Sequence, residues 1–569
     1  MLANVRPFAV AVALLAVAAL SQAAQFSELW GQHGEKYNPA GVLPDFSFAG
    51  YERGEKAIPE RAAEVSVKSF GAVGDGKSND TAAFKRAIEE AAGKVIGIPA
   101  GRYVLSDVLE IGSSGTVLKG AGADKTVLVF VKSLQELRPT SAETGSGKPT
   151  TAWSWSGGLV WFKGRNPVGR VLTEVEAPGA KRGDTSVPVA DASQFKAGQD
   201  VAVSVKDDSE GSFVKYIFRD RPEDAKKLVG RHGYRYAARI REVKEKAVVL
   251  DRSLRFDLRP EWSASLCAFA PDLQQSGIED LTFEFPRQPY RAHWEEDGYN
   301  AIQFDNCAHC WARRLVIHNS DSGIYLKGFF CTVSDVVFTA NRRALSKGET
   351  GHHGIEADGV DNLVTRFQFK TRFFHEITVS HALGNVISDG SGVLLTLDHH
   401  KGAPYENLFT NLDTGEGGPE IWKSGGPPGV GLHCAAGATF WNIRGKRESG
   451  LPPAGWGPSG LVFVGLKGVL RKSEQRTGWH YEPIQPGALS PPNLHLAQLA
   501  RRLATNGVGT APASQRWTTI TGQAFEAKFG GISGANVIFI LPDGRRAFYP
   551  LASLSVESRA AVNKLATPR

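Results

Sequence analysis

The fold is decided by residues 69–129, SFGAVGDGKSNDTAAFKRAIEEAAGKVIGIPAGRYVLSDVLEIGSSGTVLKGAGADKTVLV. A glycine-rich turn leads into Asp80, whose side chain can cap the helix that follows, and Gly93 can end that helix. The apolar residues of one helical face are Ala83, Phe84, Ala87, Ile88 and Ala91. Short strands separated by Gly and Pro turns are expected over residues 95–98, 103–105, 117–118 and 127–130. One capping helix before many short strands predicts a β-solenoid.

The segments GAVGDGKSNDTAAFKRAI, GIPAGRYVLS and TVLKGAG occur in this order within residues 71–122. Together they resemble the opening of the pectate-lyase-like superfamily of right-handed parallel β-helices. The resemblance implies an all-β, single-stranded solenoid with an N-terminal capping helix, and polysaccharides as the class of substrate. It carries no catalytic mechanism, because the superfamily contains lyases, hydrolases and non-catalytic tail proteins.

The first 24 residues have the three parts of a secretory signal peptide. Arg6 supplies the positive start, residues 9–20 form a short apolar core, and residues 21–24, SQAA, offer a small-residue cleavage site. The apolar run is too short to span a membrane, and no later segment reaches the length required. We therefore expect a secreted or periplasmic protein without a membrane span.

The charge and the cysteines exclude some classes of partner and of fold. A net charge of +7 and a pI of about 9.0 suit an acidic polysaccharide as substrate. Nucleic acid is not expected, because the chain is exported and has no dense basic patch. Five cysteines in 569 residues are too few for a disulfide scaffold. Cys307 and Cys310 form a CxxC with no second pair at zinc-site spacing, so we expect buried thiols inside the coils.

The chain divides into several parts. After an N-terminal extension over residues 25–64, the β-helix is expected over residues 65–470, with a β-rich insertion at about 132–262 that resembles a small β-barrel. The segments LVIHN and VFTAN end in Asn319 and Asn341, which are 22 positions apart. One coil of such a solenoid takes roughly this many residues, so the two segments should stack.

The last part of the chain is expected to be a separate module. Residues 471–514 form a linker with a short helix over residues 497–503. Residues 515–569 contain RWT, FEAKF, VIFILPDGR and PLASLS, and they resemble the SLA1 homology domain 1, a small SH3-like β-barrel. That resemblance implies binding to a protein or tethering to a cell surface rather than catalysis.

Histidines concentrate in the later coils. Of the 14 in the chain, seven lie between residues 352 and 433. Equivalent positions of successive coils lie about 5 Å apart, so residues distant in sequence can meet on one lateral patch. The histidines of this window are His352, His353, His375, His381, His399, His400 and His433.

The first mechanism that these residues suggest is β-elimination. A base removes the proton beside a uronate carboxyl while positive groups neutralise the developing enolate. The candidate bases are His375, His399 and His400. The candidate substrate-binding groups are the charge stabilisers Arg366, Lys370 and Arg372, with Tyr405 as the donor to the leaving oxygen.

Glycoside hydrolysis is the alternative, because it needs two carboxyl groups that flank the bond. Glu356, Asp358 and Asp398 are the candidates, and Glu356 and Asp358 should share one strand face. A divalent metal is possible, because His353 with Glu356, and Asp398 with His399 and His400, are suitable ligand types. No tight metal signature indicates one, so we expect no cofactor. Trp422, Trp441 and Tyr405 could stack on sugar rings.

We therefore expect an exported enzyme that cleaves glycosidic bonds in a polysaccharide. The basic charge and the His, Arg and Lys residues narrowly favour a lyase that acts on an acidic glycan. A glycoside hydrolase is the close alternative. A non-catalytic glycan-binding or surface protein is the alternative from a different class.

Overall fold

The computed structural model describes residues 23–345, 347–467, 478–505, 515–533, 536–540 and 546–566. The predicted signal peptide lies outside the described residues except for residues 23 and 24. Two parts of the predicted linker, residues 471–477 and 506–514, also lie outside them. No helix in the described part of the chain is both long enough and apolar enough to cross a membrane.

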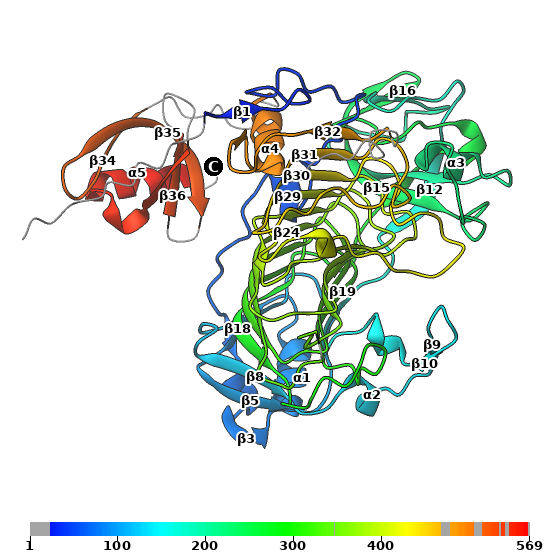
Figure 1. The fold of residues 1–569 in the computed structure, drawn as a ribbon. Coiled ribbons are helices and arrows are strands. Elements are labelled where there is room, and N and C mark those ends of the chain that lie inside the picture. Colours follow the sequence, from blue (N-terminus) through cyan, green and yellow to red (C-terminus); the bar gives the residue numbers. More distant parts are fainter. Residues whose placement is uncertain are drawn as a thin grey trace, which may run out of the picture.

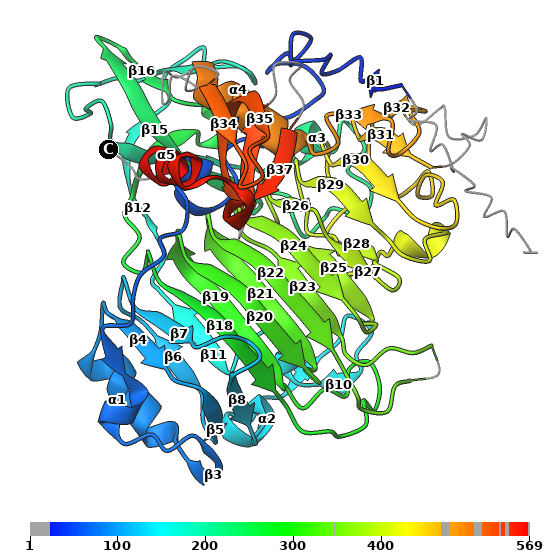
Figure 2. The ribbon, with the colours of Figure 1, turned by 90° about the vertical axis from the view of Figure 1, so that its left-hand side faces the viewer.

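The central part of the chain is a parallel β-helix with two sheets (Figures 1 and 2). Among the described residues, seven parallel strands form what we call the short sheet. In spatial order they are β6 (Leu109–Ile111), β11 (Val160–Lys163), β19 (Asn300–Ala308), β21 (Ser322–Phe329), β23 (His353–Ala357), β25 (His375–Val379) and β28 (Leu397–His399).

Sixteen strands form the second sheet, which we call the long sheet, among the described residues. Its main path runs through β2 (Val65–Ser66), β4 (Val95–Ile98), β7 (Val117–Gly120), β18 (Gly277–Glu284), β20 (Trp311–His318), β22 (Thr332–Thr339), β24 (Leu363–Phe369), β26 (Val386–Ser388), β29 (Leu408–Asp413), β30 (Thr439–Arg444), β31 (Val462–Leu466) and β32 (His480–Glu482). Beside this path lie β3 (Asp75–Asn79), β5 (Gly101–Leu105), β8 (Thr126–Phe130) and β27 (Ser391–Gly392). Because β32 still pairs with β31, the solenoid continues beyond the predicted end at residue 470.

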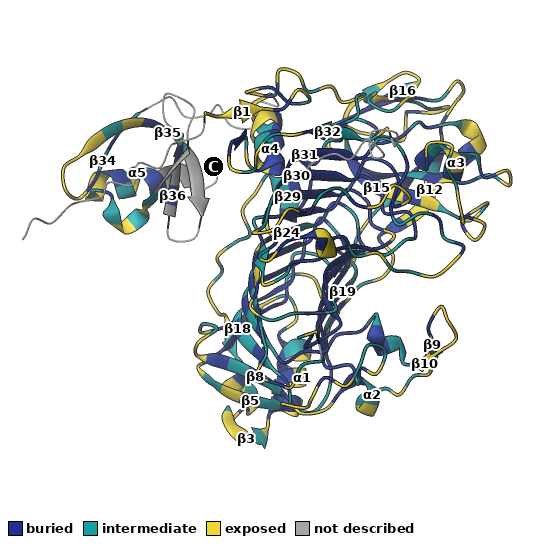
Figure 3. Cartoon of the chain, in the orientation of Figure 1, coloured by how far each residue is buried: buried dark blue, intermediate teal, exposed yellow. Residues whose placement is uncertain are grey.

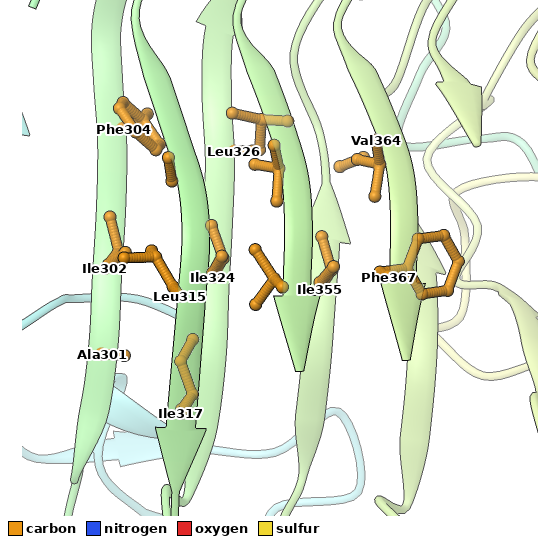
Figure 4. Packing of buried hydrophobic residues seen from close by; sticks show 14 of the residues in the cluster. Ala301, Ile302, Phe304, Leu315, Ile317, Ile324, Leu326, Ile355, Val364 and Phe367 are labelled. Atoms are coloured by element: carbon orange, nitrogen blue, oxygen red, sulfur yellow. The ribbon is translucent and has the colours of Figure 1, made fainter. Parts of the chain in front are cut away.

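The core lies between the two sheets, where apolar side chains of successive coils stack (Figures 3 and 4). In the short sheet the register places Ile302, Ile324, Ile355, Ile377 and Leu397 beside one another in turn. In the long sheet the rings of Phe338 and Phe369 stack with centroids 4.4 Å apart. Each of these buried side chains contributes about 1.5–3 kcal/mol to the free energy of unfolding.

The predicted repeat at Asn319 and Asn341 is confirmed, with one difference in register. The Asn319 side-chain amide donates to Asn341 Oδ1 at 2.9 Å, so the two asparagines stack as expected. The strands before them pair at a spacing of 21 residues, since Leu315 lies opposite Val336. The second coil therefore accommodates one extra residue between its strand and its asparagine.

The N-terminal helix α1 (Thr81–Glu90) is present, but Asp80 does not cap it. The Asp80 carboxylate instead accepts hydrogen bonds from the backbone amides of Val73 and Gly74, at 2.6 and 3.1 Å. It thus holds the glycine turn in place. The helix ends at Glu90, before the predicted stop at Gly93.

The insertion is shorter than predicted, because β11 belongs to the short sheet. Its strands form one antiparallel sheet, and a bridge between Val175 and Val189 joins the two outer strands, so the sheet closes like a small barrel. In spatial order the strands are β12 (Val168–Glu174), β17 (Ser265–Phe269), β14 (Asp200–Lys206), β15 (Gly233–Lys244), β16 (Ala247–Leu250) and β13 (Ser186–Pro188). Helix α3 (Ser212–Ile217) packs in the same apolar cluster.

Buried ion pairs join the insertion to the coils, and we call these residues the arginine network. Arg252 donates to Asp361 Oδ2 at 2.6 Å, and Arg255 bridges Asp361 and Glu406. Arg182 donates to the other oxygen of Glu406 at 2.9 Å. All four carboxylate oxygens of Asp361 and Glu406 accept from an arginine.

The N-terminal segment packs against the end of the solenoid. Strand β1 (Gln25–Phe26) pairs with β33 (Leu489–Ser490), and helix α4 (Leu494–Thr505) covers the predicted helix at 497–503. In α4, His495 Nδ1 lies 2.9 Å from the carbonyl oxygen of Phe46.

The C-terminal residues contain a four-stranded antiparallel sheet followed by α5 (Val556–Ala566). Its strands are β34 (Gln515–Thr518), β35 (Ala524–Ser533), β36 (Asn536–Ile540) and β37 (Arg546–Pro550). Trp517 and Phe539 lie in its apolar cluster. The likeness of this module to the SLA1 homology domain 1 stays a prediction.

Candidate functional site

Ionisable side chains gather on the outer face of β23, β25 and β28. The register places His353 beside His375, Glu356 beside Thr378, and Thr378 beside Asp398. The apolar neighbours Ile355, Ile377 and Leu397 lie in the core. Polar side chains of three successive coils thus meet on one lateral patch, as the sequence predicts.

Asp398 lies at the centre of this patch and is fully buried. Its Oδ2 lies 2.8 Å from His400 Nδ1 and 3.2 Å from His375 Nδ1. Asp398 Oδ1 has no hydrogen-bond partner among the described residues. One carboxylate oxygen therefore faces two imidazole rings, and the other is left for a further donor.

The pKa values of His375 and His400 are shifted in opposite directions. Burial opposes ionisation of Asp398, but His375 and His400 outweigh burial and lower its pKa below the usual range. Burial lowers the pKa of His375 to about 4 despite the attraction of Asp398. For His400 burial acts in the same direction, but Asp398 outweighs it and raises the pKa above the ordinary value. His400 is also the more exposed ring, with 19% of its side chain accessible against 5% for His375.

Glu356 and Asp358 lie beside these histidines, as the sequence predicts for a pair on one strand face. Glu356 Oε2 is 3.5 Å from His353 Nδ1, and Asp358 is half-buried. Burial raises the pKa of Glu356 well above its usual range, and the nearby charge of Asp358 raises it further. The patch thus holds a carboxyl that favours its protonated form and, in Asp398, one that favours its ionised form.

A loop between β18 and β19 adds residues that sequence reasoning missed. His293 Nε2 lies 2.9 Å from Nε2 of His352, the residue before β23. His352 Nδ1 is 3.5 Å from Glu296 Oε1, and burial raises the pKa of Glu296 to about 7. We call the five rings gathered here the histidine cluster: His293, His352, His353, His375 and His400.

Aromatic rings and lysines surround the histidine cluster. Half-buried Phe374 and Trp294 lie on either side of His293, with ring centroids 4.0 and 4.1 Å from it. Lys423 Nζ lies 4.7 Å from the centre of the Phe374 ring. Lys148 lies in the hairpin of β9 (Ala142–Glu143) and β10 (Pro149–Thr150). Burial lowers the pKa of His293 to about 3, and the charges of Lys148 and Lys423 lower it in the same direction.

Glycine lets the chain approach His400 closely. A Cβ placed on Gly425 would lie only 2.4 Å from His400 Cε1. The loop that holds Lys423 therefore passes directly over the His400 ring. In Figure 1 the short sheet, marked by β19, is on the side of the solenoid where β9, β10 and the insertion lie.

Two residues predicted for the site lie elsewhere in the fold. His399 follows Asp398 in β28, so its side chain points into the coil and contacts the rings of Phe409, Phe440 and Trp456. The expectation that it acts beside Asp398 and His400 is wrong. Tyr405 is buried with the core of the insertion and donates to the carbonyl oxygen of Arg255 at 3.2 Å, so it cannot reach a leaving group.

The three predicted cations also lie outside the patch. Arg366 is on β24 of the long sheet and makes two hydrogen bonds of 2.8 Å to Asp335. Lys370 follows the same strand and is exposed. Arg372 precedes β25 but donates to the carbonyl oxygen of Lys347 at 2.6 Å. The positive charges near the histidine cluster come instead from Lys423 and Lys148.

Some of the missed residues left a signal in the sequence and others did not. His352 and His353 stand out as a pair before an alternating strand, and the segment 351–359 holds both of them and Glu356. His293, Trp294 and Glu296 precede the histidine-rich window and come from a loop, where no period marks a shared face. Of the aromatic residues predicted to stack on sugars, Trp441 and Trp422 are buried, at 0% and 8% exposure.

The cysteine prediction is confirmed, and one partner is new. Cys307 and Cys310 lie in the apolar core of the coils with Cys331, whose Sγ is 3.8 Å from Cys307 Sγ. Cys310 and Cys331 donate to backbone carbonyl oxygens at 3.4 and 3.5 Å. The three cysteines thus lie within the packed core of the coils.

Comparison with known protein families gives one match. The family model "Rhamnogalacturonase A/epimerase, pectate lyase-like" matches residues 64–160. This region contains α1 and the first strands of both sheets, and it ends before the histidine cluster begins. The match supports the resemblance to the pectate-lyase-like superfamily for the first coils.

Curated relatives match a short part of the chain. The pre-neck appendage protein of Bacillus phage B103 is 47% identical over 70 residues, which are 12% of this chain and 8% of that protein. Alginate lyase 7 of Azotobacter vinelandii is 33% identical over 96 residues, or 15% of this chain and 11% of that enzyme. The chain thus matches only about a tenth of the length of these relatives.

Among solved structures, the tailspike of Pseudomonas phage phi297 aligns with 67% of this chain and 60% of its own length. Its sequence identity is 13% and the TM-score is 0.37. The family model ends at residue 160, before the residues of the histidine cluster.

Proposed function

We propose that the protein cleaves an acidic polysaccharide by β-elimination on the outer face of β23, β25 and β28. The observation that carries this proposal is the contact between His400 and Asp398. A partly exposed imidazole lies 2.8 Å from a buried carboxylate. A base whose orientation is fixed by a second group is the arrangement that enzymes use for proton abstraction.

In the proposed reaction His400 takes the proton from the carbon beside the uronate carboxyl. The electron pair of that C–H bond forms a C=C bond, the bond to the glycosidic oxygen breaks, and the leaving oxygen takes up a proton from solvent. Asp398 stabilises the imidazolium ion that forms on His400, so it is a positioning residue. Lys423 and Lys148 supply positive charge for the substrate's carboxylate, and Trp294 and Phe374 supply apolar faces for sugar rings.

The proposal extends to where the reaction happens. The N-terminal signal peptide would export the protein to the periplasm or the medium, where acidic polysaccharides are found. The C-terminal module would bind a protein or a cell surface and keep the solenoid near its substrate. A polysaccharide ligand is also supported by the curated relatives, since one of them is an alginate lyase.

The test is to incubate the purified chain with polyuronates, sulfated glycans and neutral glycans. The ultraviolet absorbance of the new C=C bond and the number of reducing ends are followed together. Both signals should rise on a polyuronate and should be lost in His400→Gln. His318→Gln is the matched control, because His318 lies on β20 of the long sheet, where its Nδ1 contacts Thr339 Oγ1. Binding without either signal would overturn the enzymatic proposal in favour of a glycan-binding protein.

A second candidate is glycoside hydrolysis by Glu356 and Asp398 or Asp358. It is favoured by the opposite directions in which the pKa values of Glu356 and Asp398 are shifted, since an acid and an ionised carboxylate are what hydrolysis needs. Against it, Asp398 is fully buried behind two histidines. Reducing ends without the absorbance change, lost in Glu356→Gln and kept in His400→Gln, would establish hydrolysis instead.

A further inference from the structure

We propose that His293, His352 and His375 bind a Zn²⁺-type transition-metal ion. One ring nitrogen from each of the three lies within 4.8 Å of the others. The Nε2 atoms of His293 and His352 are 2.9 Å apart. Two nitrogens at this separation can bind the same ion, because a Zn–N bond is about 2.0–2.1 Å long.

The groups behind these rings support a metal site. A histidine that binds a metal through one nitrogen usually donates its other N–H to a carboxylate. His352 Nδ1 faces Glu296 Oε1 at 3.5 Å, and His375 Nδ1 faces Asp398 Oδ2 at 3.2 Å. Both Nδ1 atoms are buried and have no hydrogen bond among the described residues. Contraction of these two contacts on metal binding would give both nitrogens a partner.

The chemistry of the three ligands selects the class of ion. Neutral imidazoles suit zinc and its transition-metal neighbours, whereas Ca²⁺ and Mg²⁺ prefer oxygen ligands. Metal binding requires a free lone pair on each ring, which a neutral imidazole supplies. Burial favours the neutral form of all three rings. It lowers the pKa of His293 to about 3, that of His375 to about 4, and that of His352 well below its usual range. Three protein ligands leave one position of a tetrahedral ion open.

Another triad at the same place competes for the ion. His375, Asp398 and His400 also bring one atom each within 4.8 Å. In that triad Asp398 Oδ2 contacts both rings, at 2.8 and 3.2 Å, so an ion would break two contacts to a buried carboxylate. In the first triad an ion would replace one contact, that between Nε2 of His293 and Nε2 of His352. In the first triad the carboxylates Glu296 and Asp398 lie behind the ligands.

The role of the ion rests on the proposed function. At its open position the ion would bind the carboxylate of the uronate and stabilise the negative charge that develops when His400 removes the neighbouring proton. Asp398 would then orient both the metal ligand His375 and the base His400 through one oxygen atom.

The test measures metal binding without substrate, so its outcome is independent of the proposed function. The full chain is stripped with a chelator, Zn²⁺ is added against a competing metal-sensitive dye, and Co²⁺ is added as a spectroscopic probe. We expect one Zn²⁺ per chain and the visible absorption of nitrogen-ligated Co²⁺. His352→Ala and His293→Ala should lose the ion, and Glu296→Gln should weaken binding by about 10–100-fold. Thermal unfolding monitors whether each variant is folded.

His400→Gln and His318→Gln separate the outcomes. Both should bind Zn²⁺ as the unsubstituted chain does, although His400→Gln should lose the elimination activity. An ion that is lost in His400→Gln and kept in His293→Ala would overturn the assignment and place the metal in the second triad. A folded chain that binds no ion, but is active, would overturn the metal site and leave the proposed function standing. A chain that binds the ion but has no elimination activity would leave the metal site standing and overturn the proposed function.

Discussion

The histidine cluster and the arginine network are both buried collections of ionisable groups, but they differ in how completely the groups are paired. In the arginine network all four oxygens of Asp361 and Glu406 accept from an arginine, and among the described residues Arg255 Nε is the buried group of the network that has no hydrogen-bond partner. In and beside the histidine cluster, several buried atoms have no hydrogen-bond partner among the described residues. They are the Nδ1 atoms of His352 and His375 in the cluster, and Asp398 Oδ1 and Glu356 Oε2 beside it. Burying a polar group without a partner costs about 1–3 kcal/mol.

The difference separates structure from function in this molecule. The arginine network fixes the insertion on the coils, and its charges already have their counterions. The groups around the histidine cluster still have open hydrogen-bonding positions among the described residues, which the proposed metal and substrate would take. A buried charge by itself therefore says little about function here, whereas a buried group left without a partner on the outer face of a sheet points to a site.

The largest expected effect separates the two regions by activity. His400→Gln should lower the rate of elimination by about 10²–10⁴-fold, because it removes the general base. The free energy of unfolding should fall by only about 1–3 kcal/mol, because the substitution weakens one contact to buried Asp398. Initial rates and urea unfolding of the same samples measure both quantities. A large loss of stability with little loss of rate would mean that the cluster is structural.

The reverse pattern is expected for the arginine network. Asp361→Asn leaves Arg252 and Arg255 buried without their full counter-charge, so the free energy of unfolding should fall by about 3–5 kcal/mol. The rate per folded molecule should stay unchanged. Asp335→Asn is the matched control, because Asp335 also pairs with an arginine, Arg366, but both side chains are exposed. That substitution should cost about 0–1 kcal/mol.

Acid should reveal the arginine network in the unmodified chain. Arg252 and Arg255 outweigh the effect of burial and lower the pKa of Asp361 below its value in an unfolded chain, which is about 3.9. The stabilisation is therefore complete above that unfolded value and is lost as the pH falls through the folded one. In this acid range Asp361 should contribute a slope of up to about 1.4 kcal/mol per pH unit, which Asp361→Asn should lack. Identical slopes in the two proteins would mean that folding does not shift the pKa of Asp361.

The sequence predicts the scaffold far better than the site, for a physical reason. The turn at Gly71–Gly76, α1 and the repeat of Asn319 and Asn341 are local patterns, so the solenoid follows from them. The patch on β23, β25 and β28 follows in part, because coil stacking brings equivalent positions together. His293, Glu296 and Lys423 belong to loops that fold over the sheet, and nothing in their local sequence fixes where a loop ends in space. The prediction for His399 is wrong because neighbouring residues of a strand face opposite sides, so His399 points inward where Asp398 points outward.

His399 is the hardest test of this comparison. Both of its ring nitrogens lack a hydrogen-bond partner among the described residues, although the ring lies inside the coil. If an unpaired buried group marks a site only on the outer face of the sheet, His399 lowers the free energy of unfolding and has no part in the site. Its ring is enclosed by Phe409, Phe440 and Trp456, so His399→Leu replaces a polar side chain by an apolar one of similar size. We expect the free energy of unfolding to rise by about 1 kcal/mol, with an unchanged rate of elimination. Urea unfolding and initial rates measure both, and a folded His399→Leu variant that has lost activity would show that the inside of the coil takes part in the site.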